Sequence, residues 1–265
     1  MWVVFAHFLL RKPFPHSVAG TLLHCRPFIL EMAYRVSQQL FSSLPLPPAQ
    51  LVNLESMGYS EMTPIQAATL PQALAGVDLI GQAKTGSGKT AAFALPLLAR
   101  LNPRDFGTQA LILCPTRELA SQVASEIRRL ARYQQNIKVV TLCGGQSIGP
   151  QIGSLEHGAH VVVGTPGRIK DHLHKETLSL ERISTLVLDE ADRMLDMGFE
   201  AQVRSIAQQI RPNRQTAMFS ATRRTLWACM GDFKKAFPFT DRDDLLDIVY
   251  SRADVKGGRY ALLAD

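Results

Sequence analysis

The chain has few cysteines and no hydrophobic segment long enough to cross a membrane. Its four cysteines, Cys25, Cys114, Cys143 and Cys229, show no paired spacing. This argues against a disulfide framework or a zinc site and favours a reducing, cytoplasmic location. The apolar stretch MWVVFAHFLL at residues 1–10 is too short to span a bilayer. We therefore expect no membrane partner.

A strong excess of one charge is also missing. The net charge is +6 over 265 residues, divided into +3 for residues 1–36, +2 for residues 37–222 and +1 for residues 223–265. A protein that binds nucleic acid through charge alone concentrates its Lys and Arg on one face. Any argument for nucleic acid must therefore rest on individual residues.

The two ends of the chain differ in character from its middle. Arg11 and Lys12 follow the first apolar run, whereas a signal peptide carries its positive charge before such a run. We expect residues 1–36 to form an atypical, disordered leader. After Thr222 the alternation of strand and helix patterns fades, so residues 223–265 are expected to form an atypical tail.

The middle of the chain alternates between short apolar runs and helical patterns. The apolar runs occupy residues 77–82, 110–114, 138–142, 160–164, 185–189 and 216–219, and the clearest helical patterns occupy residues 89–101, 117–132 and 200–210. Near-continuous apolar strands separated by helices indicate an α/β fold, a mostly parallel sheet with helices on both faces. Ligands of such sheets bind beyond the carboxyl ends of the strands, which is where the polar clusters of this chain occur.

The sequence AKTGSGKT at residues 83–90 follows one apolar run and precedes a helical pattern. A glycine-rich loop lets several backbone N–H groups face a phosphate, and the following helix contributes its positive end. Lys89 would reach the terminal phosphates and Thr90 would offer its hydroxyl to Mg²⁺. Ala83 stands where this pattern usually has its first glycine. A flexible turn without a ligand is the structural alternative.

The sequence DEAD at residues 189–192 ends another apolar run. A carboxylate at a strand end beside a phosphate loop suits a second contact to Mg²⁺, here Asp189, through water. The neighbouring Glu190 can orient and deprotonate an attacking water. The alternative is that the acidic residues simply favour the start of a helix.

With these motifs the chain resembles the DEAD-box ATP-dependent RNA helicases over residues 39–222. The resemblance rests on seven segments in the order typical of that family, and in this family Ala83 is usual. They are GYSEMTPIQ (58–66), AKTGSGKT (83–90), PTRELA (115–120), GG (144–145), TPGR (165–168), DEADRMLDMGF (189–199) and SAT (220–222). The resemblance implies that residues 37–222 form a RecA-like P-loop NTPase domain, the first of the two such domains of the family. The amino-acid sequence is most similar to that of a bacterial type of this family that acts on large-subunit ribosomal RNA. This similarity implies a role in ribosome biogenesis.

The resemblance implies a set of residues for ATP, with Mg²⁺ held by Thr90 and Asp189 and with catalysis by Glu190, Lys89 and Asp189. The ATP-binding set is Phe41, Tyr59, Thr63, Gln66, Ala83, Lys84, Thr85, Gly86, Ser87, Gly88, Lys89 and Thr90. The amide of Gln66 can both donate to and accept from an adenine edge, and Thr63 would position it. Phe41 and Tyr59 could offer an aromatic surface to the base, although Tyr59 could equally pack in the core.

A second implied set binds single-stranded RNA. It consists of Pro115, Thr116, Arg117, Gly144, Gly145, Thr165, Gly167 and Arg168. Hydroxyl, guanidinium and backbone N–H donors suit phosphates and 2′-hydroxyls and read no bases, so RNA and not DNA is the expected partner. Taken singly, each of these residues could belong to an ordinary turn or helix cap.

Asp192, Ser220 and Thr222 are implied to couple the nucleotide site to movement between domains. The family's second RecA-like domain, which supplies arginines to the γ-phosphate, is not recognisable after Thr222. A trans-acting arginine contributes a factor of ~10³–10⁵ in phosphoryl transfer, so autonomous unwinding by this chain is not expected. We interpret the tail as the product of a shifted reading frame or an aberrant coding end. The alternative function is a non-catalytic module that binds ATP and RNA.

Overall fold

A parallel sheet forms the centre of the computed structural model, which describes residues 40–221 and 260–263. The expectations for the leader, for Thr222 and for most of the tail lie outside the described residues. The strands are β1 (Asp78–Gln82), β2 (Ala110–Leu113), β3 (Val139–Leu142), β4 (Val161–Gly164), β5 (Thr185–Leu188), β6 (Gln215–Ser220) and β7 (Tyr260–Leu263). Their order in the sheet is β3-β4-β2-β5-β6-β1-β7, and all neighbouring pairs are parallel. All six predicted strands are present, and β7 is an addition from the tail that the sequence did not predict.

Among the described residues, two helices precede the first strand of the sheet, and the other helices connect successive strands. They are α4 (Pro48–Ser56), α5 (Pro64–Leu74), α6 (Lys89–Arg100), α7 (Arg117–Leu130), α8 (Gly149–Glu156), α9 (Pro166–His174), α10 (Ala191–Asp196) and α11 (Glu200–Gln209), with 3-10 turns η1 (Phe41–Ser43) and η2 (Ala131–Tyr133). The predicted helical patterns correspond to α6, α7 and α11, each within two residues at its carboxyl end. Within the described part of the chain, no helix is long and apolar enough to cross a membrane.

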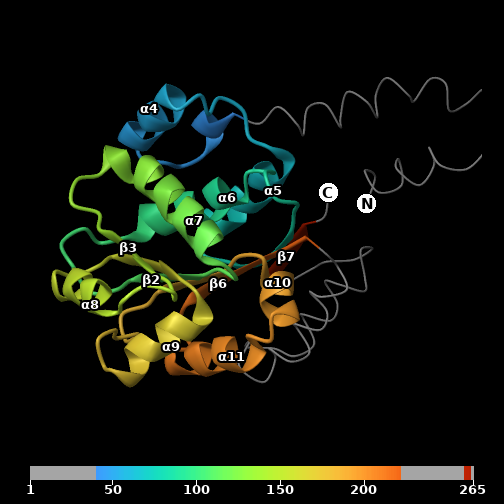
Figure 1. The fold of residues 1–265 in the computed structure, drawn as a ribbon. Helices are drawn as coiled ribbons and strands as arrows, with labels where there is room; N and C mark the ends of the chain where they lie inside the picture. Colours follow the sequence, from blue (N-terminus) through green and yellow to red (C-terminus); the bar gives the residue numbers. More distant parts are fainter. Residues whose placement is uncertain (1–39, 222–259, 264–265) are drawn as a thin grey trace, which may run out of the picture.

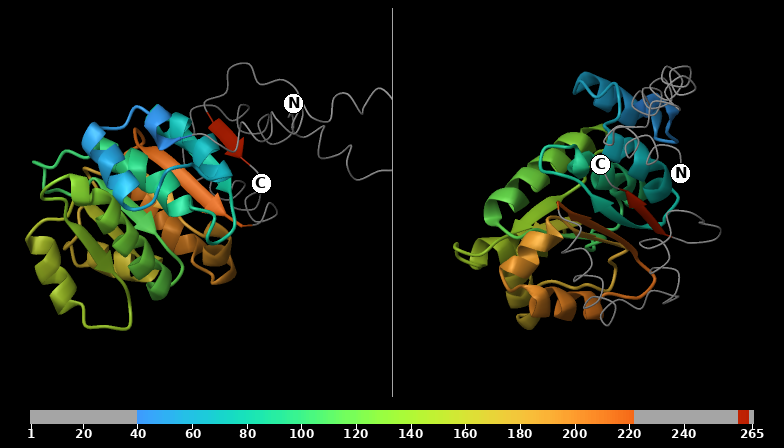
Figure 2. Two further views of the ribbon diagram at one scale, coloured as in Figure 1. Left: turned by 90° about the horizontal axis from the view of Figure 1, so that it is seen from above. Right: turned by 90° about the vertical axis from the view of Figure 1, so that its right-hand side faces the viewer.

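The helices cover both faces of the sheet, as predicted. Figure 1 shows α4, α5, α6 and α7 on one side and α9, α10 and α11 on the other, and the views in Figure 2 agree. The central strand β2 is fully buried, with Ile112 in the core cluster of the first face and Leu111 and Leu113 in that of the second. Burial on both faces explains why the strands read as continuous apolar runs.

Candidate nucleotide and RNA sites

Apart from Phe41 and the segment at residues 58–66, which precede β1, the predicted functional segments lie at the carboxyl ends of strands, and the strand order sorts them into two groups. The phosphate loop and the DEAD segment follow β1 and β5, and Ser220 ends β6, which lies between those two strands in the sheet. The segments beginning at Pro115, at Gly144 and at Thr165 follow the neighbouring strands β2, β3 and β4. Residues predicted for nucleotide and residues predicted for RNA therefore occupy adjacent halves of one sheet edge.

The phosphate loop runs from β1 into α6 through two glycines in the left-handed region. Gly86 has a φ of 84° and Gly88, at the amino end of α6, has a φ of 91°. Ala83 is buried, and its N–H donates to the carbonyl of Ser220 over 3.0 Å. The loop is thus anchored to β6 at its first residue and is exposed from Lys84 to Gly86.

Lys89 is the buried cation of this loop. Its Nζ lies 3.7 Å from Oδ1 of Asp189, and its side chain is 6% exposed. Its Nζ has no hydrogen-bond partner in the structure, although an ammonium group carries three donors. A buried donor of this kind at the end of a glycine loop fits the oxygens of a phosphate group.

Asp189 and Glu190 lie directly beyond β5. Burial raises the pKa of the Asp189 carboxyl, and the charge of Lys89 opposes that rise. Glu190 adopts a left-handed φ of 51°, and its N–H donates to Oδ1 of Asp189 over 3.0 Å. The Asp189 carboxylate is therefore held between the Glu190 backbone and the ammonium of Lys89 in the phosphate loop.

Both oxygens of Glu190 have partners within this site. Oε1 accepts a hydrogen bond from Oγ1 of Thr85 over 3.1 Å, and Oε2 lies 3.3 Å from Nη1 of Arg193. The sequence reasoning missed Arg193. The signal that was available is its spacing, three residues after Glu190 at the start of a helix, where side chains meet.

The oxygen donors around Lys89 suit a hard divalent cation. No group of three or more His, Cys, Asp or Glu side chains that could hold a metal occurs among residues 40–221 and 260–263. Mg²⁺, however, is commonly held by one or two protein oxygens together with waters and substrate phosphates. Thr90 and Asp189 fit that sparse donor set.

Gln66 contacts the phosphate loop directly. Its Oε1 accepts from the N–H of Thr63 over 2.9 Å and its Nε2 donates to the carbonyl of Gly88 over 3.0 Å. The amide is 1% exposed. The structure therefore brings together Thr63, Gln66 and Gly88, which all belong to the predicted ATP-binding set. Because both ends of the Gln66 amide already bond to the protein backbone, the contact of Gln66 with adenine stays a prediction.

Phe41 and Tyr59 form an edge-to-face pair with ring centroids 5.7 Å apart. Phe41 is 2% exposed within the core. Tyr59 donates its hydroxyl to Oε1 of Glu126 over 2.8 Å, and burial together with this bond raises its pKa to about 12. Phe41 was expected to offer an open aromatic surface to the base. Its ring is instead covered, because it packs in the core against Tyr59.

The segment after β2 begins α7. Pro115 is buried. Thr116 caps the helix by accepting from the N–H of Leu119 over 3.3 Å, so it has the ordinary helix-capping role that the sequence left open as an alternative to RNA binding. Arg117 is about half exposed and lies against Gly145, where an added Cβ would contact its guanidinium. Arg117 and the Gly144–Gly145 loop therefore share one surface.

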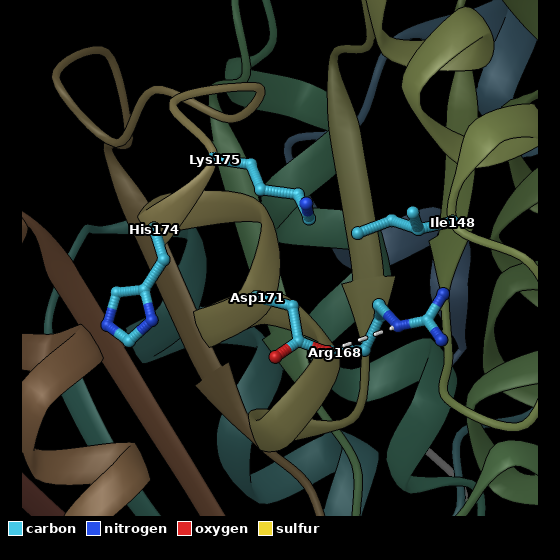
Figure 3. A pocket seen from close by; sticks show the side chains of 5 residues that line it. All are labelled: Ile148, Arg168, Asp171, His174 and Lys175. Atoms are coloured by element: carbon cyan, nitrogen blue, oxygen red, sulfur yellow. Dashed lines mark ion pairs between the residues drawn. The ribbon is translucent and has the colours of Figure 1, made fainter.

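The segment after β4 begins α9. Thr165 is buried, its N–H donates to the carbonyl of Leu142 over 3.1 Å, and open space surrounds Gly167. Nη2 of Arg168 donates to the carbonyl of Gln146 over 2.8 Å, and its Nε lies 3.5 Å from Oδ2 of Asp171. Figure 3 shows this ion pair in a pocket of about 480 Å³. The pocket is lined by Ile148, Arg168, Asp171, His174 and Lys175.

The end of β6 meets α10. Oδ2 of Asp192 accepts from the N–H of Ala221 over 3.0 Å, and Ser220 is fully buried. Nε2 of Gln82 donates to the carbonyl of Ala221 over 3.3 Å. A contact between the DEAD segment and the end of β6 is therefore present at the backbone of Ala221, a residue to which the sequence had assigned no role. The contacts of Asp192 with Ser220 and Thr222 stay predictions.

Comparisons with known proteins point to one family. The model of the family described as DEAD/DEAH box helicase matches residues 63–226. The chain is 60% identical over 183 residues to the ATP-dependent RNA helicase DbpA of Escherichia coli (strain K12), covering 69% of this chain and 40% of DbpA. It is 47% identical over 182 residues to the DEAD-box ATP-dependent RNA helicase CshA of Bacillus cereus, covering 69% of this chain and 34% of CshA.

A solved structure shows the same fold. The crystal structure of a DEAD box protein from the hyperthermophile Methanococcus jannaschii matches with a TM-score of 0.72 and 37% identity, covering 86% of this chain and 56% of that one. The chain thus spans less than half the length of the two curated relatives named above.

Proposed function

Because the chain belongs to the DEAD/DEAH box helicase family, we propose that it provides the ATP-binding domain of an ATP-dependent RNA helicase. The single observation that carries this proposal is the buried ammonium of Lys89, which has no hydrogen-bond partner and lies 3.7 Å from Asp189 at the phosphate loop. Such a group is costly to bury unless a ligand pairs with it.

ATP binds with its phosphates on the loop from Ala83 to Thr90. Backbone N–H groups of Lys84, Thr85, Gly86, Ser87 and Gly88 line the loop, and Lys89 pairs with the terminal phosphates. Gln66, positioned by Thr63, contacts the adenine edge. Tyr59 supplies an aromatic surface for the base, and Phe41 packs edge-to-face against Tyr59. Supporting this arrangement, Gln66 already contacts the loop at Gly88.

Glu190 accepts a proton from the water that attacks the γ-phosphate. For this the Glu190 carboxylate must exchange its bond from Thr85 for one from water, while Arg193 continues to hold the other oxygen. Thr90 and Asp189 hold Mg²⁺ together with the phosphates. When bound, Mg²⁺ neutralises the charge of the phosphate oxygens.

Single-stranded RNA lies along the ends of β2, β4 and β3. Its phosphates and 2′-hydroxyls contact the segments that carry Arg117, Gly145 and Arg168. The full set is Pro115, Thr116, Arg117, Gly144, Gly145, Thr165, Gly167 and Arg168. Since 2′-hydroxyl contacts distinguish RNA from DNA, the partner is RNA. Large-subunit ribosomal RNA, and with it ribosome biogenesis in the cytoplasm, is the specific assignment that we propose, on the sequence resemblance described above.

Turnover requires a second RecA-like domain that brings arginine to the γ-phosphate. Residues 37–222 form the first such domain, and Asp192, Ser220 and Thr222 couple its nucleotide site to the second. The contact of Asp192 with the Ala221 backbone supports that route. Without the second domain, hydrolysis is slower by a factor of about 10³–10⁵.

RNA-stimulated ATP turnover tests the proposal. The purified 265-residue chain is assayed alone and with a recombinant second RecA-like domain added in trans. We expect turnover only with both the second domain and RNA present, and none in Lys89→Ala or Glu190→Gln. Arg104→Ala, which removes an exposed cation from the loop between α6 and β2, is the matched control and retains turnover. Nucleotide binding without any rescued turnover would identify a non-catalytic module instead.

A further inference from the structure

A continuous chain of buried hydrogen bonds joins α9 to the loop after β3. Gln151 on α8 is 8% exposed and His172 on α9 is fully buried. Nε2 of Gln151 donates to the carbonyl of Cys143 over 2.9 Å. Oε1 of Gln151 lies 3.2 Å from Nε2 of His172, whose Nδ1 lies 2.8 Å from Oγ1 of Thr177. None of these contacts belongs to the phosphate loop or to the DEAD segment.

The Cys143 carbonyl fixes the direction of the hydrogen bonds that Gln151 makes. A carbonyl only accepts, so the Cys143 carbonyl requires the amide nitrogen of Gln151 on its side, which leaves Oε1 facing His172. With Oε1 of Gln151 facing it, Nε2 of His172 carries the ring proton. The Thr177 hydroxyl, which has a single proton, lies 2.8 Å from Nδ1 of His172 and 3.2 Å from the His172 carbonyl, so these two acceptors share it. Burial, with a contribution from Arg168, lowers the pKa of His172, so the neutral ring that this arrangement needs is the stable form at neutral pH. A fully satisfied buried chain of this kind specifies one geometry.

The chain of hydrogen bonds links the loop proposed for RNA to the helix that carries Arg168, and its far end, Thr177, lies just beyond that helix. Cys143 directly precedes Gly144 and Gly145. His172 lies four residues after Arg168 on α9, so both side chains leave the same face of the helix. Arg168 reaches the same loop at the carbonyl of Gln146 over 2.8 Å. Helix α9 therefore braces the loop after β3 at two points, once directly and once through Gln151.

We infer that Gln151 and His172 are positioning residues, which fix the spacing between the Gly144–Gly145 loop and the start of α9. The inference rests on the proposed RNA surface, because that surface is where the spacing matters. Phosphates along an RNA strand are regularly spaced, so donors from two segments bind them together only when their separation is held before binding. A loop that is free to shift would lose conformational entropy each time RNA binds, and this loss lowers the affinity.

The test compares two glutamines that are equally buried and differ in location. Gln151→Met removes the bonds to Cys143 and to His172 while keeping the side-chain volume. Gln109→Met is the matched control, because Gln109 is 7% exposed and its Nε2 donates to the Asn102 carbonyl over 2.8 Å at the opposite, amino-terminal edge of the sheet. Three measurements are made on each full-length variant: amide hydrogen exchange of residues 143–148, affinity for a single-stranded RNA oligonucleotide, and affinity for a fluorescent ATP analogue.

We expect faster exchange at residues 143–148 in Gln151→Met and an RNA affinity lowered by about three- to tenfold, the effect of losing the bond to Cys143 that holds the loop. ATP affinity should not change, and Gln109→Met should leave both readouts as in the parent. Thr177→Val removes only the far end of the chain and should give a smaller change in the same direction, which keeps the test decisive if Gln151→Met folds poorly.

The outcomes separate this inference from the proposed function. Unchanged exchange at residues 143–148 overturns the positioning role whether or not RNA binds. Faster exchange with RNA affinity equal to that of the parent also overturns it. A parent chain that binds no RNA, alone or with the second domain, overturns the proposed RNA surface and this inference with it, while the exchange data still report whether Gln151 braces the loop.

Discussion

At the scale of single residues, Gly88 is the position where the phosphate loop tolerates no side chain. Its φ is 91°, and a Cβ there would lie 2.4 Å from Nε2 of Gln66. We expect Gly88→Ala to cost ~1–2 kcal/mol of stability from the left-handed backbone alone and to displace Gln66 from the loop. ATP affinity, measured by titration of a fluorescent analogue, should fall by at least about tenfold, since an effect near 1.4 kcal/mol corresponds to that factor.

Gly86 provides the matched control for this effect. Its φ of 84° imposes the same backbone cost, but no atom lies within 4 Å of its added Cβ. Gly86→Ala should therefore lose similar stability in urea unfolding while leaving Gln66 in place. Equal losses of ATP affinity in both variants would show that backbone strain matters here and that contact with Gln66 does not.

The sequence predicted the residue types of this site but not their mutual contacts. The loop, Gln66 and Glu190 were recognised from local patterns, because each pattern is contiguous. The bonds from Gln66 to Gly88 and from Thr85 to Glu190 join residues 22 and 105 positions apart. Such contacts follow from how the strands assemble, which no local pattern encodes. The burial of Phe41 was missed for the same reason.

At the scale of elements, α9 carries a titratable group inside the core. The pKa of His172 lies below its ordinary value of 6.5, first because of burial and then because of Arg168. Below pH 6.5 the unfolded chain takes up a proton that the folded chain resists, so this group lowers stability as the pH falls. We expect the free energy of unfolding, measured in urea between pH 7.5 and pH 5, to decline less steeply in His172→Gln than in the parent.

His174 serves as the control on the same helix, since it is exposed. His174→Gln should retain the slope of the parent. Some pH dependence will persist in every variant, because burial also lowers the pKa of His160. A His172→Gln slope as steep as that of the parent would show that the buried imidazole is not what links stability to pH.

Element types were predictable, whereas their arrangement was not. The six strands from β1 to β6 were recognised because burial on both faces makes each of them continuously apolar, as at Leu111 and Ile112. Their order in the sheet was not, because parallel strands of similar composition do not specify their neighbours. The strand β7 escaped prediction because it is four residues long within a polar tail.

At the scale of the whole molecule, the segments proposed for the ATP phosphates and those proposed for RNA occupy separate halves of one sheet edge. Binding to each should therefore be separable by mutation. We expect Lys89→Met to abolish binding of the ATP analogue and to leave RNA affinity unchanged in the absence of nucleotide. Arg117→Ala should weaken RNA binding and reduce its salt slope by about one, with unchanged ATP affinity. Loss of both affinities in either variant would indicate a single shared site.

The strand order also determines when the nucleotide site can form during protein synthesis. The strand β1, which leads into the phosphate loop, pairs with β6 and not with β2, so Leu79 lies beside Ala217, and Ala83 is anchored to Ser220. These contacts are non-local, and they close only after the chain between them has been made. A nascent chain that ends before β6 would therefore carry the complete phosphate-loop sequence without its support. The proposed ability to bind ATP should therefore be gained only after residues 215–220 have been synthesised.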